Sequence, residues 1–391
     1  MDFRLTNEQA QWKQEVIDFL EKEATPDFLE GLERQEDWAQ DAVSFSFSRK
    51  LAAKGWLALT WPREYGGLER PYMDKAIFDE QMGYYHAPRG AHLMGCNLGG
   101  CFLRVGTEEQ KARLIPPIVR QEVAYAQGFT EPQAGTDLAS LVTRAVRDRD
   151  CYVITGEKHY INHANYADYI FLATRTDPKV PKHGGISLFV VDLKSPGITI
   201  RPMRTVFHGR LSQLLFDNVR VPAANLIGNE NEGWKIIMDV LAHERQQLYQ
   251  AGSYKRIFDE LVVYAREAKR DGRPVIQDPI VKFRLAEWAT ILEATRLISW
   301  RVAWMQSEGM TPGIATNIDS LFHREREHEF FNFAMEILGR RGQLQLRSKG
   351  AQWLVGRVER MYRRTAASTG GGGNIELSKN IIALRGLGLP R

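Results

Sequence analysis

The feature that most constrains the fold is a change of sequence pattern near Ala124 and again near Leu226. Between these points, short runs rich in β-branched and aromatic residues alternate with Gly, Pro and Asp turns, which predicts a β-domain of about a hundred residues. The runs are Tyr152–Thr155, Tyr169–Leu172 and Ser187–Val191. On both sides of this segment apolar residues recur at intervals of three and four, the pattern of amphipathic helices. The sequence therefore predicts a mostly helical α+β protein with the order α, β, α.

Helix start signals support this division. Thr6-x-x-Gln9 and Thr107-x-x-Gln110 are capping boxes, in which a threonine and a glutamine satisfy each other's free backbone N–H groups. Beyond Gly233 long helical patterns cover residues 234–269, 279–306 and 317–338. We expect three domains: a helical one over residues 1–122, a β one over residues 123–230, and a helical one over residues 231–391.

Composition excludes several classes of function. The 391 residues are 43% apolar and 26% charged, as in an ordinary globular protein, and a net charge of +4 does not indicate nucleic-acid binding. No run approaches the 18 apolar residues of a membrane span, and the first residues do not form a signal core, so we expect a cytoplasmic protein. The histidines and the three cysteines show no metal-ligand spacing, so no metal is implied. The run Gly370–Gly373 followed by Lys379 lacks the register of a P-loop.

Two segments carry the signal for a cofactor, Gln127–Asp137 and Gly156–Asp168. In the first, a strand pattern ends at Thr130 and breaks at Pro132 and Gly135, which leaves backbone N–H groups on an exposed turn where they can approach a phosphate or a flat ring. In the second, Tyr160 and Asn162 lie two residues apart and so on one face of a strand, which suits the face and the polar edge of a flavin. An aromatic residue in a half-buried strand is more often part of the core, and the pattern alone leaves both interpretations open.

In this order and spacing the two segments resemble the flavin-contacting segments of the acyl-CoA dehydrogenase family. The resemblance extends over nearly the whole chain, through the motifs Trp61–Gly67, Gly106–Lys111, Ser187–Asp192, Pro196–Ile198, Phe216–Pro222, Lys379–Ala383 and Leu387–Pro390. It implies a β-barrel-like domain between two helical domains, with a four-helix bundle at the C-terminal end. It also implies FAD as the cofactor and an acyl-CoA as the substrate.

Residue by residue, the resemblance predicts the following flavin contacts: Gln127, Phe129, Thr130, Thr136, Tyr160, Asn162, Asn374 and Glu376. Thr136 is expected near the flavin pyrophosphate and the CoA chain. Tyr160 stands where many relatives have tryptophan, and Asn162 where they have threonine, so the flavin potential is expected to differ.

The chemistry of such an enzyme needs a carboxylate base for the α-proton, a flavin for the β-hydride, and hydrogen-bond donors on the thioester carbonyl. Many family members carry the base in the position that Gly372 occupies here, so the commonest catalytic glutamate is missing. A second branch, resembling the isovaleryl-CoA and long-chain acyl-CoA dehydrogenases, places it on the first long helix of the C-terminal domain. There Glu244 takes the base position and Arg245 the substrate-facing position. Gly372 still has a backbone N–H that can donate to the thioester carbonyl.

The chain departs from the family where homotetrameric relatives complete a neighbour's flavin site. The motifs that hold the ADP half are replaced by Ala268–Gly272, Pro279 and Glu336–Arg340. Alanine and proline cannot donate the side-chain hydrogen bonds that arginine and glutamine supply. This erosion resembles the bacterial branch that forms α2β2 complexes on bulky substrates. We therefore expect either a homo-oligomer or, in preference, a heterotetramer with a homologous subunit.

Three functions remain at this stage. The first is an FAD-dependent acyl-CoA dehydrogenase that acts on a branched, cyclic or otherwise bulky acyl group and passes electrons to an electron-transfer flavoprotein. The second is a flavin monooxygenase on the same fold, against which Glu244 argues because such an enzyme needs no α-proton acceptor. The third is a non-catalytic subunit of a heteromeric dehydrogenase, which the eroded ADP contacts keep open.

Overall fold

A computed structural model describes residues 3–34, 37–206, 210–244, 247–368 and 374–390. The chain packs into two compact units, each assembled from separate stretches of sequence. The helical unit comprises Met1–Glu36, Arg70–Ala87 and Arg245–Arg391, and the sheet unit comprises Asp37–Glu69 and Pro88–Glu244. Packing therefore groups the first helices of the chain with its last ones, whereas composition divides the chain into three consecutive segments.

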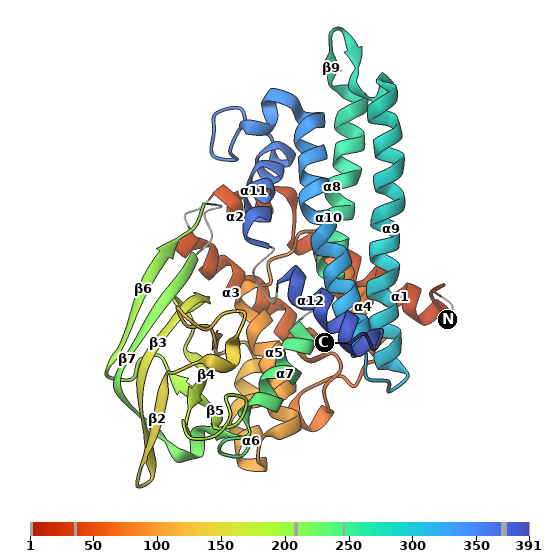
Figure 1. Cartoon of the computed structure of the whole chain (residues 1–391). Coiled ribbons are helices and arrows are strands. Elements are labelled where there is room, and N and C mark those ends of the chain that lie inside the picture. The colour runs from red at the N-terminus through yellow and green to blue at the C-terminus, as the bar shows by residue number, and fades with distance from the viewer. Residues whose placement is uncertain (1–2, 35–36, 207–209, 245–246, 369–373, 391) are drawn as a thin grey trace. The chain divides into compact units, whose positions relative to one another are not determined.

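The sheet unit is built on an eight-stranded sheet, as the alternating pattern after Ala124 predicts (Figure 1). Its strands are β1 (Tyr125–Gly128), β2 (Arg144–Asp148), β3 (Cys151–Asn162), β4 (Tyr169–Arg175), β5 (Ile186–Asp192), β6 (Ile198–Arg204), β7 (Arg210–Pro222) and β8 (Leu226–Ile227). The order is β6-β7-β3-β2-β4-β5-β8, and β1 pairs in parallel with β4. Along β4, Phe171 packs in one apolar cluster and Ile170 in another, so both faces of this strand are buried.

Four α-helices complete the sheet unit: α3 (Asp37–Ala53), α5 (Gly90–Val105), α6 (Glu108–Val119) and α7 (Gly233–Glu244). The predicted capping box at Thr107 is confirmed, because its Oγ1 accepts from the Gln110 backbone at 3.2 Å and the Gln110 side chain accepts from Thr107 N–H at 3.1 Å. The Gln110 amide also donates to the Leu226 carbonyl at 2.7 Å, which ties α6 to β8.

The helical unit contains α1 (Asn7–Glu23), α2 (Pro26–Arg34), α4 (Tyr72–Tyr84), α8 (Leu248–Glu267), α9 (Pro279–Ser307), α10 (Ile314–Leu338), α11 (Trp353–Ser368) and α12 (Ile375–Ile381). The expected single helix over residues 234–269 is wrong: α7 ends at Glu244 and α8 begins at Leu248. The chain beyond α8 forms a small hairpin of β9 (Lys269–Arg270) and β10 (Arg273–Pro274). The Asp278 side chain then caps α9 by accepting from Ile280 N–H at 2.9 Å.

Helices α4 and α8 approach so closely that two glycines are needed at their contact. A Cβ on Gly83 would lie 1.9 Å from the Tyr249 carbonyl oxygen, and one on Gly252 would lie 2.1 Å from the Glu80 carbonyl oxygen. Both contacts are backbone on backbone, so no side-chain rearrangement can relieve them. This contact holds α4 against the bundle of α8, α9 and α10.

The core of the helical unit is aromatic, with Trp288, Phe330, Phe331 and Phe333 all buried. None of the helices in the described ranges is sufficiently long and apolar to cross a lipid bilayer.

Candidate functional site

The two predicted cofactor segments lie side by side in the sheet unit. β1 ends at Gly128, and the chain continues through Phe129 and Thr130 next to the far end of β3. The carbonyl oxygen of Thr130 accepts a hydrogen bond from the backbone N–H of His159 at 2.9 Å. Residues about thirty positions apart in the sequence are therefore joined directly, and the turn after β1 is fixed against the strand that carries Tyr160 and Asn162.

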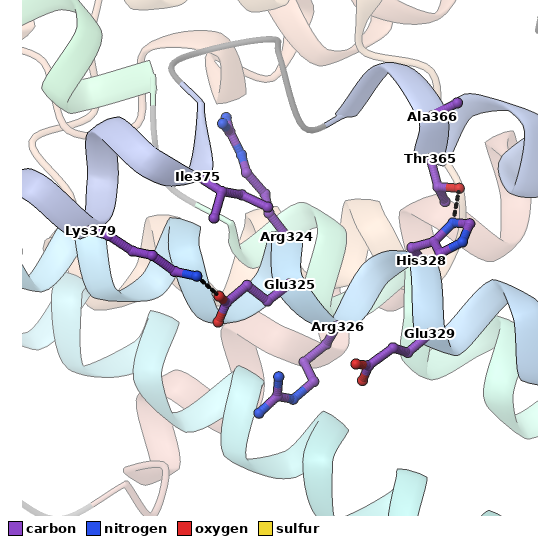
Figure 2. Close-up of a pocket in the computed structure, with 9 residues that line it drawn as sticks. All are labelled: Arg324, Glu325, Arg326, His328, Glu329, Thr365, Ala366, Ile375 and Lys379. Atoms are coloured by element: carbon purple, nitrogen blue, oxygen red, sulfur yellow. Dashed lines mark hydrogen bonds and ion pairs between the residues drawn. The ribbon is translucent and has the colours of Figure 1, made fainter.

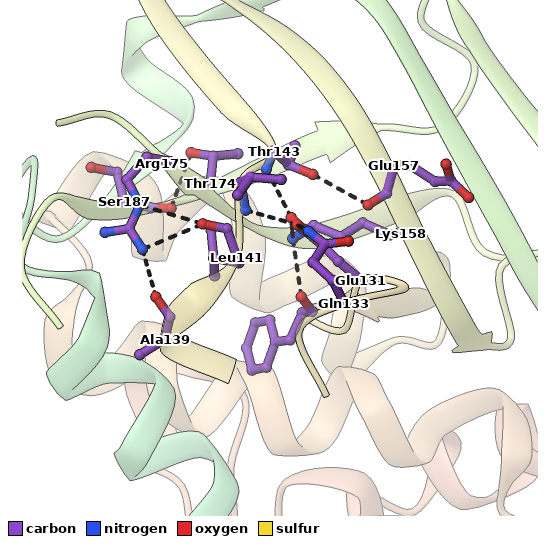
Figure 3. A network of polar contacts seen from close by, with 12 residues as sticks. Glu131, Gln133, Ala139, Leu141, Thr143, Glu157, Lys158, Thr174, Arg175 and Ser187 are labelled. Carbon is purple, nitrogen blue, oxygen red and sulfur yellow. Dashed lines mark hydrogen bonds and ion pairs between the residues drawn. The ribbon is translucent and has the colours of Figure 1, made fainter. Parts of the chain in front are cut away.

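A buried ion pair holds this junction together (Figure 3). The Lys158 ammonium lies 2.8 Å from Glu131 Oε1 and also donates to the Phe129 carbonyl at 3.0 Å. Glu131 accepts further hydrogen bonds from the backbone N–H groups of Val142 at 2.7 Å and Thr143 at 2.9 Å. The side chains of Lys158 and Glu131 are 0% and 1% exposed. Both charges are thus paired and hydrogen-bonded, the condition under which burial of an ion pair is tolerated.

The pKa values of the pair agree with a charged state near neutral pH. Burial would raise the pKa of Glu131, but the Lys158 ammonium and the hydrogen bonds from Lys158, Thr143 and Val142 outweigh it and lower that pKa. Burial lowers the pKa of Lys158 to about 8, against the opposing attraction of Glu131. The pair was not predicted from the sequence. The available signal was a lysine at an inward-facing position of β3, in step with buried Tyr152 and Ile154.

Tyr160 and Asn162 are presented to solvent at the end of β3. Tyr160 is 56% exposed and has a φ of 57°, and the pairing of β3 with β7 shifts register between Lys158 and Ile161. Lys158 faces inward, two residues before the exposed Tyr160, and Ile161 is buried, so the side chains change sides at this register shift. After the shift Tyr160 and Asn162 are both exposed. A large aromatic ring exposed beside a polar amide, on a backbone fixed by a buried ion pair, fits one face of a flat cofactor such as the flavin.

The other predicted contacts of the sheet unit differ in exposure. The ring of Phe129 is 3% exposed and packs on Phe171 with centroids 6.1 Å apart, so any contact it makes with a cofactor must come from its backbone. Gln127 and Thr130 are half-buried, and Thr136 is exposed on the bend that follows. The structure therefore brings Gln127, Phe129 and Thr130 to one strand end with Tyr160 and Asn162, and it places Thr136 further along the turn.

The remaining predicted site residues belong to the chain's helical parts. Asn374 caps α12, its Oδ1 accepting from Leu377 N–H at 2.6 Å, and Glu376 is exposed in the first turn of that helix. Glu244 is the last residue of α7, and its side chain lies outside the described residues. Arg245 and Gly372 also lie outside them.

A pocket of about 550 Å³ opens in the helical unit between α10, α11 and α12 (Figure 2). Ile375, which lines it, stands between the two predicted flavin contacts Asn374 and Glu376. Its charged walls are mixed: Lys379 pairs with Glu325 at 2.7 Å, and His328 bonds to Thr365 at 2.9 Å. Charges of both signs do not select an anionic ligand, so this pocket alone assigns no function.

Comparison with known proteins identifies the family. Models of the acyl-CoA dehydrogenase N-terminal, middle and C-terminal domains match residues 6–122, 126–219 and 231–387. Acyl-CoA dehydrogenase FadE26 of Mycobacterium tuberculosis is 35% identical over 100% of this chain and 99% of its own length. A chain of the ChsE4-ChsE5 complex from Mycobacterium tuberculosis superposes with a TM-score of 0.91 at 35% identity, covering 100% of both chains. A chain of the Tcur3481-Tcur3483 steroid ACAD superposes with a TM-score of 0.90 at 32% identity, again over 100% of both.

The helical and sheet elements together with the three matching family models define a flavin-dependent oxidoreductase. The chain belongs to the acyl-CoA dehydrogenase family. It is an FAD-dependent enzyme that dehydrogenates an acyl-CoA, and the α+β, mostly helical fold expected from the sequence is confirmed.

Proposed function

We propose that this enzyme introduces an α,β double bond into a bulky acyl-CoA thioester, with Glu244 as the base that removes the α-proton. The observation that carries the proposal is the position of Glu244 at the end of α7, in a family whose usual base position is occupied here by Gly372. Arg245 would face the substrate beside it, and the backbone N–H of Gly372 would donate to the thioester carbonyl. FAD, when bound, would supply the acceptor for the β-hydride.

The sheet unit would hold the cofactor through the face described above. Tyr160 and Asn162 would contact the ring system, Thr130 and Gln127 would lie at its edge, and Phe129 would contribute its backbone. Thr136 would lie near the pyrophosphate and the CoA chain. We also propose Asn374 and Glu376, at the start of α12, as FAD contacts.

Replacement of the base tests this assignment. Glu244→Gln keeps the size of the side chain but removes the proton acceptor, so substrate-dependent flavin bleaching under anaerobic conditions should slow by roughly 10²- to 10⁴-fold while FAD stays bound. Asp239→Asn is a matched control, because it removes a carboxylate on the same helix that pairs with Arg104. Unchanged bleaching by Glu244→Gln would remove this residue as the base.

The assembly that we propose is a heterotetramer with a homologous chain. Three observations on this chain support it. Glu336, where homotetrameric relatives have a flavin-binding glutamine, pairs with Arg284 of its own unit. Arg270 donates to the Glu336 carbonyl at 2.9 Å, and Pro279 forms the first turn of α9. These contacts within the chain support the proposal, because Pro279 cannot donate a side-chain hydrogen bond and a carboxylate at Glu336 would repel a pyrophosphate. One of the similar solved structures is the ChsE4-ChsE5 complex, and another, the Tcur3481-Tcur3483 steroid ACAD, carries the names of two proteins.

Co-expression tests the assembly. Produced alone, this chain should purify with little FAD, and production with a homologous partner chain should raise the ratio of flavin absorbance to protein to one FAD per site. A fully flavinated, active homo-oligomer of this chain alone would contradict the proposal. Transfer of electrons to an electron-transfer flavoprotein, measured by its reduction after substrate addition, tests the proposed acceptor separately.

A further inference from the structure

Helices α8, α9 and α10 run side by side in the helical unit (Figure 1). One part of the interface between them is polar instead of apolar. On α10, Asp319 and Ser320 are 1% exposed and His323 is 3% exposed. These three residues share one face of the helix, since residues three and four positions apart are neighbours on a helix surface. One and two turns further along, the same face carries Glu327 and then the buried aromatic core at Phe330.

The partners of this polar face come from α8 and α9. Ser299 on α9 donates to Asp319 Oδ1 at 2.6 Å. The ring of Tyr254 on α8 stacks on His323 with centroids 4.7 Å apart, and its hydroxyl donates to Glu327. The backbone of Gln247, at the start of α8, acts to lower the pKa of the Asp319 carboxyl. Gln250 lies three residues after Gln247 and four before Tyr254, so the three share one face of α8.

Five buried polar atoms at this level have no hydrogen-bond partner among the described residues. They are Gln250 Oε1, Asp319 Oδ2, Ser320 Oγ, His323 Nδ1 and His323 Nε2. A buried donor or acceptor without a partner costs about 1–3 kcal/mol, and native proteins rarely leave several together. A serine within a helix usually bonds back to the carbonyl four residues before it, yet Ser320 does not. The described side chains of this group do not satisfy one another, so the group can hydrogen-bond to a ligand or to water.

The chemistry of the five atoms restricts what can fill the site. Burial lowers the pKa of His323 to about 4, so the imidazole is neutral near pH 7, with one nitrogen donating and the other accepting. Gln250 Oε1 only accepts, and so does Asp319 Oδ2 when that carboxyl is ionised. A ketone oxygen would satisfy donors alone and leave these acceptors unpaired. A hydroxyl group both donates and accepts, and it carries no charge that burial would penalise.

We infer that this polar face is a recognition site for a hydroxyl group on the distal part of the acyl substrate, an inference that rests on the proposed function. The chain that follows the candidate base supplies one wall of the site, because Gln247, Gln250 and Tyr254 come directly after Glu244 in sequence. Water offers the same hydrogen bonds as a hydroxyl, so the experiment has to separate these two sources.

The experiment compares three ring-bearing acyl-CoA thioesters that differ only at one distal position, which carries a hydroxyl group, a ketone or hydrogen. The flavinated enzyme is used, and kcat/KM is measured from anaerobic flavin bleaching. The wild-type enzyme should prefer the hydroxyl compound over the hydrogen compound by at least about 100-fold, since sites built to hydrogen-bond a hydroxyl discriminate strongly against analogues without it. The ketone should fall between them.

Ser320→Ala and His323→Phe should each reduce this preference by about tenfold or more, by lowering kcat/KM for the hydroxyl compound alone. Thr295→Val is the matched control. It removes a buried hydroxyl in the same bundle that already bonds to the Ile291 carbonyl at 2.8 Å, so the preference should stay. Ser320→Ala changes one atom and keeps the inference testable if His323→Phe folds poorly.

Equal kcat/KM for the three thioesters, or a preference that survives both variants, would overturn the inference and leave water as the occupant. Absence of bleaching with every thioester is a different result, because it would contradict the proposed dehydrogenase and not this site alone.

Discussion

Each of the two units contains a small group of buried polar side chains, but the hydrogen bonding of the two groups differs. In the sheet unit, Glu131 and Lys158 are fully buried, and they bond to each other and to the backbone of Phe129, Val142 and Thr143. In the helical unit, Asp319, Ser320 and His323 are equally buried but keep four of their polar atoms without a partner among the described residues. The first group holds the backbone in place. In the second group, the missing hydrogen-bond partner is the hydroxyl group that we infer above.

This difference separates a structural network from a binding site by one criterion, the satisfaction of hydrogen bonds. Full satisfaction in a low-dielectric interior makes a network rigid, and partial satisfaction costs free energy until a ligand completes it. Removal of one member should therefore lower the free energy of unfolding in the sheet unit and leave it unchanged or raise it in the helical unit.

The largest effect is expected from Lys158→Met. It leaves the Glu131 carboxylate buried without its counter-charge, which should lower the free energy of unfolding by about 3–5 kcal/mol. Urea denaturation followed by tryptophan fluorescence measures the change. Lys182→Met is the control, because its pair with Asp137 at 2.8 Å is half-exposed on both sides and should be worth at most about 1 kcal/mol. Equal losses in the two variants would show that the buried pair is not a structural network.

The second prediction concerns pH and compares wild type with Asp319→Asn. Burial raises the pKa of Asp319 to about 7, against a hydrogen bond from Ser299 that lowers it. A raised pKa contributes stability that is complete below the unfolded value near 4 and is lost as pH rises toward 7. The free energy of unfolding of wild type, minus that of Asp319→Asn, should therefore fall by about 1.4 kcal/mol per pH unit near pH 5, and by roughly 2 kcal/mol in all from pH 5 to 7.

His323 titrates with the opposite sign below pH 6.5, but it is present in both proteins and largely cancels in the difference. Urea denaturation at pH 5, 6, 7 and 8 makes the comparison. Glu131 should behave the other way: its lowered pKa gives stability that is lost as pH falls below its unfolded value near 4.5. A difference between wild type and Asp319→Asn that does not change with pH would contradict the burial of an ionisable Asp319.

The smallest effect, and the one of opposite sign to the first, is expected from His323→Phe. Phenylalanine can keep the stack on Tyr254 and removes two polar atoms that have no partner. The free energy of unfolding of the substrate-free protein should stay the same or rise by up to about 2 kcal/mol. Thermal and urea denaturation check the sign. A loss of more than about 2 kcal/mol would mean that the imidazole is satisfied in the free protein and that the two units are alike.

The order α, β, α could be predicted because periodicity is a local property of the sequence. The capping boxes at Thr6 and Thr107 were predicted for the same reason, and both are present. The division of the long helix after Gly233 was missed, since apolar residues keep their helical spacing through the point where α7 ends. The grouping of α4 with α8 was also beyond the sequence, because it depends on a contact between residues more than 160 positions apart.

The candidate site was predictable where it depends on sequence motifs and not where it depends on burial. Tyr160 and Asn162 are both exposed, but their exposure depends on the register shift after Lys158, which their spacing does not predict. The ring of Phe129 lies in the core instead, because Phe171 on the neighbouring strand β4 packs against it. The residue types of Lys158 and His323 do not predict that they are buried. Only their positions within the apolar pattern of a strand or a helix would have indicated it.

The crossing of α4 and α8 sets a limit on how this protein can be dissected. Gly83 and Gly252 bring two backbones into contact. The segment that carries α4, Arg70–Ala87, belongs to the helical unit but lies in sequence between two segments of the sheet unit. A fragment that begins at α8 would therefore lose the surface that covers Gly252, and a fragment that ends before α8 would uncover Gly83. Truncation at the boundaries suggested by composition would separate α4 from α8, so both helices have to be kept in one expressed chain.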